Sequence, residues 1–237
     1  MKYGKRWLGD IPKRKNNFNI DFMILGHPRS GTGYIARLFS SLGIEIGHEG
    51  IGKYGVSCWT FVPEKSNHFF GGSGHMISIA KTSRQDFKYK FLVHIVRNPF
   101  DVINSVYYTE SKTHSQVFRL LHAVPKISDN YKVKTKEHKE ILTDSILSVI
   151  RWNNMIEDLN PDILFKIEDC ESEVAEFLES NGYEIKKEKI FDDKQYNTRK
   201  ASKVNKLSLS DYHCIENDVL DELDEYCKKH NYKNILA

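Results

Sequence analysis

Residues 22–43, FMILGHPRSGTGYIARLFSSLG, constrain the fold of this chain more than any other stretch, because an apolar run, a glycine-rich loop and an amphipathic run follow one another. The apolar residues 22–25 predict a buried strand that ends at Gly26. The apolar residues after the loop stand at helical spacing: Ile35, Leu38, Phe39 and Leu42. Gly43 is placed to end that helix. A strand, a glycine loop and a helix in this order are typical of an anion-binding site.

The loop has the start of a phosphate-binding P-loop but lacks its end. Gly26 and Gly31 match the spacing of G-x-x-x-x-G-K-[ST], yet Thr32 and Gly33 stand where that motif has its lysine and its magnesium-binding hydroxyl. In triphosphate chemistry the lysine and the magnesium ion neutralise the β- and γ-phosphates. Arg29 supplies one positive charge inside the loop. The loop therefore favours a donor whose transferred group carries less charge, such as a sulfuryl group.

A second junction between a strand and a helix lies in VHIVRNPFDVINSVYY, residues 93–108. Arg97 leaves the predicted strand, and Ser105 lies two turns along the predicted helix. A guanidinium with a nearby hydroxyl can bind a phosphate, so we expect a second anion site here. In the alternative interpretation, Arg97 only caps its strand and pairs with Asp101.

The remaining runs alternate between strands and helices. We expect strands over 44–46, 76–80, 91–96 and 163–167, and helices over 141–159, 171–181 and 211–230. Residues 51–75 are irregular by pattern and are expected to form long loops with short helical pieces. Residues 111–140 are polar and basic with weak periodicity and are expected to be a mobile insertion. This alternation predicts an α/β fold with a central, mostly parallel sheet and helices on both faces.

Length and composition favour a single domain over residues 1–237, with residues 1–20 as an N-terminal extension. The formal net charge of +3 is too small to indicate nucleic-acid binding. No apolar run approaches the roughly 18 residues that span a bilayer, and the first residues lack the apolar core of a secretory signal. We expect a cytoplasmic protein without a nucleic-acid or membrane partner, unless an anchor has been removed. No spacing of His, Cys and Asp predicts a metal site, and the oligomeric state is left open.

Taken together, the two junctions resemble the motifs of the sulfotransferases that depend on 3′-phosphoadenosine 5′-phosphosulfate (PAPS), including their bacterial members. HPRSGTGY is similar to their 5′-phosphosulfate loop, P-[KR]-S-G-T-[ST]-[WYFL], and VRNPFDVINSVYY is similar to their 3′-phosphate segment, R-[ND]-P-x-D-x-x-x-S. ILFKIEDC is a weaker match to a strand that ends in Tyr-Glu-Asp. The resemblance spans residues 21–170. It implies a P-loop-like, three-layer fold and a metal-independent enzyme.

The activity that the resemblance implies is transfer of a sulfuryl group from PAPS to a hydroxyl or amine of a small-molecule or carbohydrate acceptor, which leaves 3′-phosphoadenosine 5′-phosphate (PAP). Arg29 would hold the bridging and sulfuryl oxygens. The 5′-phosphate would be cradled by Ser30, Gly31, Thr32 and Gly33. Arg97 and Ser105 would bind the 3′-phosphate. The alternatives are a nucleotide kinase with a degenerate P-loop and a non-catalytic protein that binds PAP or PAPS.

Three further residues are candidates for nucleotide contacts. Tyr34 stands where many members of the family place an aromatic ring that stacks on adenine, but it could equally pack in the core. The basic stretch NTRKASKVNK resembles a loop that covers the nucleotide, and Arg199 and Lys200 are its candidates for the 3′-phosphate. A solvated charge run is the alternative for the later lysines of that stretch.

The base that activates the acceptor is not the usual one. Many members use the histidine of a Lys-Thr-His segment, but the comparable stretch IAKTSRQ has Ser83 at that place. Other branches use a glutamate, and Glu49 follows the predicted strand over 44–46, so we predict Glu49 as the base and His48 as the second candidate. Glu49 could instead be a surface carboxylate or a structural partner of Arg29. Lys81 would assist the leaving group or position the acceptor.

Residues 51–75 and 111–140 are the predicted lid and acceptor-binding segments, because the other segments are taken up by the fold and the nucleotide. Four aromatic residues could line an acceptor pocket or pack in the core: Trp59, Phe61, Phe69 and Phe70. His94 stands within an apolar strand and is expected to be a core residue.

Overall fold

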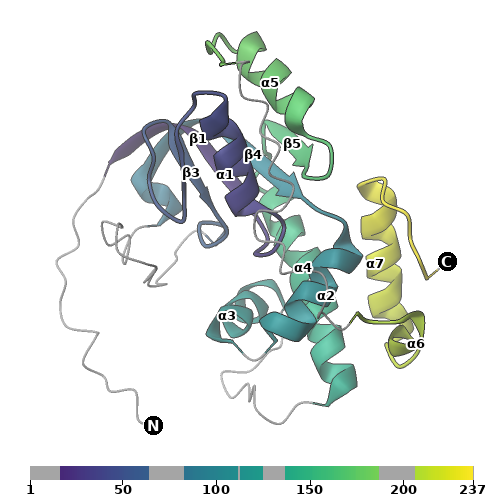
Figure 1. The fold of residues 1–237 in the computed structure, drawn as a ribbon. Coiled ribbons are helices and arrows are strands. Elements are labelled where there is room, and N and C mark those ends of the chain that lie inside the picture. Colours follow the sequence, from purple (N-terminus) through teal and green to yellow (C-terminus); the bar gives the residue numbers. More distant parts are fainter. Residues whose placement is uncertain (1–16, 64–82, 112, 125–136, 187–205, 237) are drawn as a thin grey trace, which may run out of the picture.

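The computed structural model describes residues 17–63, 83–111, 113–124, 137–186 and 206–236 (Figure 1). These residues form a five-stranded sheet in which every pair of neighbouring strands is parallel, in the order β2-β3-β1-β4-β5. The strands are β1 (Phe18–Gly26), β2 (Ile46–His48), β3 (Gly55–Cys58), β4 (Phe87–Val96) and β5 (Ile163–Lys166). The predicted α/β class is confirmed. The sheet is parallel throughout its described part.

Seven α-helices lie in the described part of the chain. They are α1 (Thr32–Ser41), α2 (Pro99–Thr109), α3 (His114–Ala123), α4 (His138–Glu157), α5 (Glu171–Ser180), α6 (Leu209–Tyr212) and α7 (Asn217–Lys229). A short 3₁₀ helix, Arg84–Asp86, precedes β4. The helix predicted over 211–230 corresponds to α7 but was expected to begin too early, because the short helix α6 ends before α7 begins. Ser208 and Asp211 cap α6 reciprocally, and Glu216 is the N-cap of α7.

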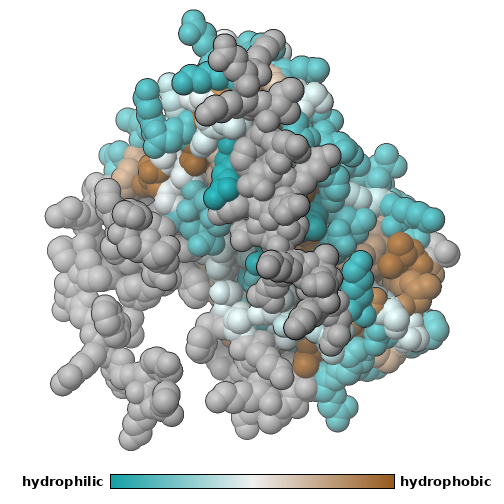
Figure 2. Space-filling model, in the orientation of Figure 1, coloured by the Kyte–Doolittle hydropathy of each residue, from teal (hydrophilic) through white to brown (hydrophobic). Residues whose placement is uncertain are grey.

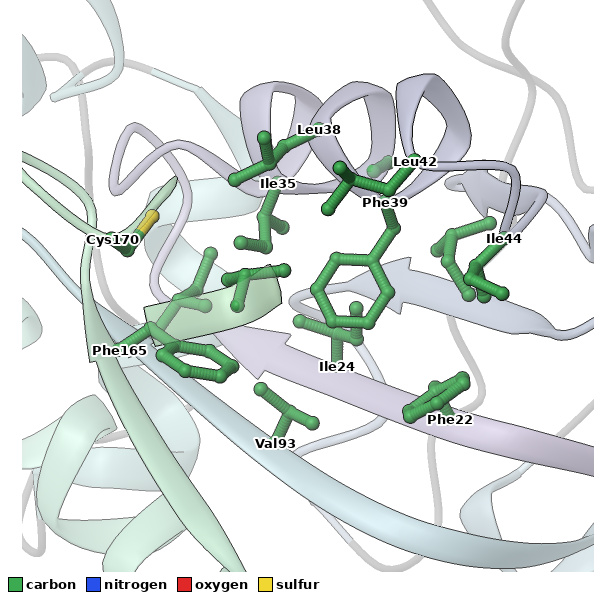
Figure 3. Packing of buried hydrophobic residues seen from close by; sticks show 14 of the residues in the cluster. Phe22, Ile24, Ile35, Leu38, Phe39, Leu42, Ile44, Val93, Phe165 and Cys170 are labelled. Atoms are coloured by element: carbon green, nitrogen blue, oxygen red, sulfur yellow. The ribbon is translucent and has the colours of Figure 1, made fainter. Parts of the chain in front are cut away.

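Helices α1 and α5 cover one face of the sheet. Figure 3 shows the side chains of α1 pointing onto those of the strands, with Phe39 above Ile24. The buried strand residues of this cluster include Phe22, Ile24, Val93, Ile95 and Phe165, and the helix residues include Ile35, Leu38, Phe39, Val174 and Leu178. The alternation of side chains along a strand sends every second residue of β1 to this face.

The opposite face of the sheet packs against α3 and α4. Met23 and Leu25 of β1 point this way and belong to a cluster with Trp152 and Ile156 of α4. His94 of β4 is fully buried, and its Nε2 lies 3.0 Å from Oδ1 of Asn153, as expected of a core histidine. Helices therefore cover both faces, which agrees with the predicted layers. A third cluster joins α2, α4, α6 and α7.

Strand β3 was not expected, because residues 51–75 read as irregular. Its sequence, GVSC, has little apolar character, although all four residues are buried. Gly55 is required by packing: a Cβ there would lie 2.1 Å from the carbonyl oxygen of Phe22 on β1. The strand predicted over 44–46 is displaced to Ile46–His48.

Residues 111–140 were expected to be a mobile insertion of weak periodicity, and their described part is largely helical. Residues 114–123 form helix α3, and α4 begins at His138. The buried positions of α3 are Gln116, Arg119, Leu120 and Ala123, which are spaced as one helical face. Because Gln116 and Arg119 are polar, this face lacks the periodic apolar pattern that predicts an amphipathic helix.

The predicted extension over 1–20 is too long, because β1 already begins at Phe18. The strand predicted over 76–80 lies outside the described residues. Among the described helices, none combines the length and apolar character that crossing a membrane demands. Figure 2 shows a hydrophobic patch near the C-terminal end of the chain, and Ile235 of that end is 44% exposed.

Candidate functional site

Several predicted site residues lie in segments that follow the carboxyl ends of neighbouring parallel strands. The residues directly after β1, β2, β3 and β4 are His27, Glu49, Trp59 and Arg97. Because the carboxyl ends of parallel strands lie at one edge of the sheet, these residues share that edge. Ligands of open α/β sheets bind at this edge. The architecture therefore gathers segments that the sequence separates.

Two glycines allow the loop between β1 and α1 to lie close to its neighbours. A Cβ on Gly26 would lie 2.4 Å from Cγ1 of Ile95. Gly31 has a φ of 95°, and a Cβ there would lie 2.5 Å from Cγ1 of Ile167. Both residues must be glycine for steric reasons, and Gly31 for conformational reasons as well.

The start of α1 presents hydrogen-bond donors. Its N-cap, Gly31, provides no side-chain cap, and its first turn holds no acidic residue. The Oγ of Ser30 is buried and has no hydrogen-bond partner among the described residues. Helix N-termini carry unpaired N–H groups and a partial positive charge, which attract anions. The buried hydroxyl adds a donor that points to the same function.

Two of the predicted site residues adopt an uncommon backbone conformation. The described non-glycine residues with a positive φ are Arg29, Glu49, Asn160 and Asn231. Asparagine tolerates this conformation, whereas arginine and glutamate seldom adopt it. Strained residues of this kind cluster at functional sites. The strain at Arg29 (φ 74°) and Glu49 (φ 53°) therefore supports their assignment to the site.

The two predicted anion-binding segments are in direct contact. Arg29 Nε donates a hydrogen bond of 2.9 Å to Oγ of Ser105 on α2. Arg97 Nη1 donates to the carbonyl oxygen of Arg29 at 3.4 Å. Arg97 also pairs with Asp101 at 3.6 Å, the contact that the alternative interpretation expected. Both contacts coexist, and Arg97 remains partly exposed.

The two candidate bases lie at the carboxyl end of β2, and one of them contacts the start of α1. Glu49 Oε1 accepts a hydrogen bond of 3.1 Å from Trp59 Nε1. His48 Nε2 lies 3.2 Å from Oγ1 of Thr32, the first residue of α1. Desolvation lowers the pKa of His48, although the Glu49 charge opposes the shift and the residue as a whole is exposed, which limits the effect. A neutral imidazole at pH 7 keeps His48 available as the second candidate.

Two aromatic candidates have structural contacts. Tyr34 packs against the cluster under α1, and its hydroxyl donates to Oε1 of Glu171 at 2.5 Å. Burial and this carboxylate raise the pKa of Tyr34. Phe61 is buried in the opposite cluster, so it packs in the core. Stacking of Tyr34 on adenine stays a prediction.

The sequence reasoning missed a buried polar network beneath the loop. Arg119 of α3 is fully buried, and its Nη2 donates to Oε2 of Glu110 at 2.7 Å. The other Glu110 oxygen lies 4.0 Å from Arg29 Nε. Arg119 Nε also donates to Oγ of Ser148, which lies 3.0 Å from Nε2 of the buried His27. Burial lowers the pKa of both His27 and Arg119, in each case more than any other effect, and the Glu110 carboxylate opposes the shift at Arg119.

A helical signal for this network exists in the sequence. Residues 116, 119, 120 and 123 recur at helical spacing, but only the last two are apolar. A search for apolar periodicity therefore passes over α3. Buried Gln116 and Arg119 would be found only by accepting polar residues on an inner helical face.

Several predicted residues lie outside the part of the chain that the structure describes, so their roles stay predictions. They are Lys81, Arg199, Lys200, Phe69 and Phe70. Ser83, at the place of the usual histidine, is described and caps the 3₁₀ helix with Asp86. Within the described ranges, no group of three or more His, Cys, Asp and Glu side chains could hold a metal ion.

Comparisons of the chain with protein-family models, with curated proteins and with solved structures find no match. The motifs and the geometry of this edge of the sheet are therefore the features that bear on function.

Proposed function

We propose that this protein is a sulfotransferase with a P-loop-like domain that moves a sulfuryl group from PAPS to a hydroxyl or amine of a small-molecule or carbohydrate acceptor. The observation that carries the proposal is the contact between Arg29 and Ser105. These residues belong to the two motifs that resemble the 5′-phosphosulfate loop and the 3′-phosphate segment. A nucleotide with phosphate groups at two places can contact both segments only if they lie no farther apart than the nucleotide is long.

The described residues suit the two ends of such a donor. The α1 N-terminus and the buried Ser30 hydroxyl offer donors to the 5′-phosphosulfate. The guanidinium of Arg97 and the hydroxyl of Ser105 offer charge-assisted and neutral hydrogen bonds to the 3′-phosphate. Arg29 connects the two segments: its side chain donates to Ser105, and its carbonyl oxygen accepts from Arg97.

In the proposed transfer step, these residues have separate roles. The acceptor oxygen or nitrogen attacks the sulfur, and the bond between sulfur and the bridging oxygen breaks. Glu49 takes the proton of the acceptor. The electron pair of the broken bond leaves with PAP, whose developing negative charge Arg29 stabilises. His48 is the second candidate for the proton.

Calorimetric titration of the purified chain with PAP, ATP and ATP–magnesium tests the donor assignment. We expect micromolar affinity for PAP that falls steeply in Arg97→Ala, because a charged phosphate partner is lost. Lys88→Ala is the matched control, since Lys88 is exposed at the opposite end of the same strand. Unchanged PAP affinity in Arg97→Ala would remove the proposed 3′-phosphate site.

The same titration separates the competing functions. Binding of ATP only with magnesium would favour a kinase with a degenerate P-loop and contradict the proposal. PAP binding without transfer from PAPS in a broad acceptor screen would indicate a binding protein without catalytic activity.

A further inference from the structure

The buried guanidinium of Arg119 has no role in the proposed transfer step. Its residue is fully buried within the described structure, at the centre of the network beneath the loop. Burying a charge is costly unless it is paired. Arg119 is paired with Glu110 at 2.7 Å, while its Nη1 has no hydrogen-bond partner among the described residues.

The Glu110 carboxylate is shared unequally between two arginines. It lies 2.7 Å from Arg119 Nη2 and 4.0 Å from Arg29 Nε. Its side chain is only 17% exposed, so water screens its charge weakly. The three side chains together carry two positive charges and one negative charge. Without Arg119, Glu110 would be left, among the described residues, with Arg29 as its ionic partner.

Arg119 also contacts the side of the site that holds the predicted base. Its guanidinium carbon lies 5.5 Å from the ring centroid of Trp59, a cation–π distance. The indole of Trp59 in turn donates to Glu49 at 3.1 Å. Arg119 therefore contacts Glu110, a partner of Arg29, and Trp59, a partner of Glu49.

We propose that Arg119 is a positioning residue: it holds the Glu110 carboxylate in the interior, so that Arg29 turns its guanidinium to the anionic donor instead of to Glu110. The inference rests on the proposed function, because it assumes an anion beside Arg29. Arg119 does not touch the donor in this account. It acts on Arg29 through Glu110.

A positioning role and a purely structural role of Arg119 predict different PAP affinities in a set of variants. Removing Arg119 alone leaves Glu110 to pair with Arg29, which lowers the net charge of the cluster from +1 to 0. Removing the Glu110 charge as well restores +1. A positioning role therefore predicts that the second substitution rescues the first, whereas lost packing predicts that it does not.

Titration with PAP tests this pattern. In Arg119→Gln we expect PAP to bind about tenfold more weakly, since Arg29 is drawn to Glu110. In the double variant Glu110→Gln/Arg119→Gln we expect affinity within about threefold of the wild type. Wild-type affinity in Arg119→Gln, or a double variant as weak as the single one, would overturn the inference.

A second pair of variants covers the case in which Arg119→Gln does not fold. Arg119→Lys and the double variant both keep one net positive charge, so both are expected to bind PAP within about threefold of the wild type. A folded Arg119→Lys protein or double variant that has lost PAP affinity would overturn the inference.

An NMR measurement without nucleotide separates this inference from the proposed function. The Nε–H signal of Arg29, assigned by its loss in Arg29→Lys, should shift downfield in Arg119→Gln as that hydrogen passes from Ser105 Oγ to the Glu110 carboxylate, and return in the double variant. If it does so while the wild type fails to bind PAP, the proposed function is wrong and the positioning role stands. If PAP binds but the signal does not move, the positioning role is wrong.

Discussion

Arg29 and Ser105 are 76 positions apart in the chain, yet Arg29 Nε donates a hydrogen bond of 2.9 Å to Oγ of Ser105. This bond joins the loop after β1 to helix α2, which follows the neighbouring strand β4. Arg29 reaches Ser105 from a left-handed backbone conformation with a φ of 74°. The bond thus places the two motifs of the proposed donor site within one hydrogen bond of each other.

Removal of the Ser105 hydroxyl is expected to weaken PAP binding. In Ser105→Ala one hydrogen bond to the 3′-phosphate is lost, worth about 1 kcal/mol or about a fivefold increase in Kd. Ser111→Ala is the control, because Ser111 donates to Tyr107 of the same helix and lies outside both motifs. Calorimetry with PAP measures both. Equal losses in the two variants would contradict the assignment of Ser105.

Glu49→Gln is expected to reduce sulfuryl transfer by a factor of about one hundred or more while PAP affinity is unchanged, because the amide cannot accept the acceptor proton. The matched control is Glu45→Gln, an exposed carboxylate just before β2. The assay follows release of PAP from PAPS in the presence of an acceptor. Near-normal transfer in Glu49→Gln would shift the role to His48, and His48→Asn would then test that residue.

The stability of the fold is expected to decrease below pH 6.5. Burial lowers the pKa of His94 to about 4 from 6.5, and burial also lowers that of His27. Between these values the unfolded state binds more protons, so the free energy of unfolding falls as the pH falls. For His94 alone the loss reaches about 3 kcal/mol.

Urea unfolding at several values between pH 7 and pH 4 measures this slope. His94→Gln should flatten it, because glutamine keeps a polar group beside Asn153 but does not titrate. His122→Gln, which removes a histidine from an exposed position of α3, is the matched control. An identical slope in His94→Gln and the wild type would contradict the assignment of the effect to His94.

Gly55→Ala is expected to destabilise the sheet by about 3 kcal/mol, because the new methyl group would collide with the backbone of β1. The collision is with the carbonyl oxygen of Phe22, at 2.1 Å. Gly182→Ala is the comparison, since its positive φ strains alanine but nothing lies within 4 Å of the new atom. Thermal and urea unfolding should show the larger loss in Gly55→Ala. A smaller loss there than in Gly182→Ala would contradict the steric account.

The elements with strong local signals could be predicted from the sequence. The apolar runs of β1 and β4, the stripe of α1 and the start of α2 all lie close to where their patterns place them. Asn98 caps α2 by accepting from the backbone N–H of Phe100, and Pro99 occupies the first turn. Each of these features depends on residues within a few positions of one another.

Where a buried segment carries polar or small residues, the sequence was misleading. Strand β3 is buried, but two of its residues are small or polar. Gly55 lies against β1, and Ser57 Oγ donates to the carbonyl oxygen of Thr32 in α1. Helix α3 turns Gln116 and Arg119 inward. Hydrophobic periodicity cannot detect elements whose inner face is polar.

By itself, the sequence determined the motif residues, the strand–loop–helix units that carry them and the α/β class. The tertiary structure alone decided that Arg29 bonds Ser105, that Glu49 accepts from Trp59, and that Arg119 lies buried behind Glu110. The physical reason is that local patterns report on neighbours one or two turns away. Contacts between distant residues depend on the order of parallel strands and on how the helices pack across them.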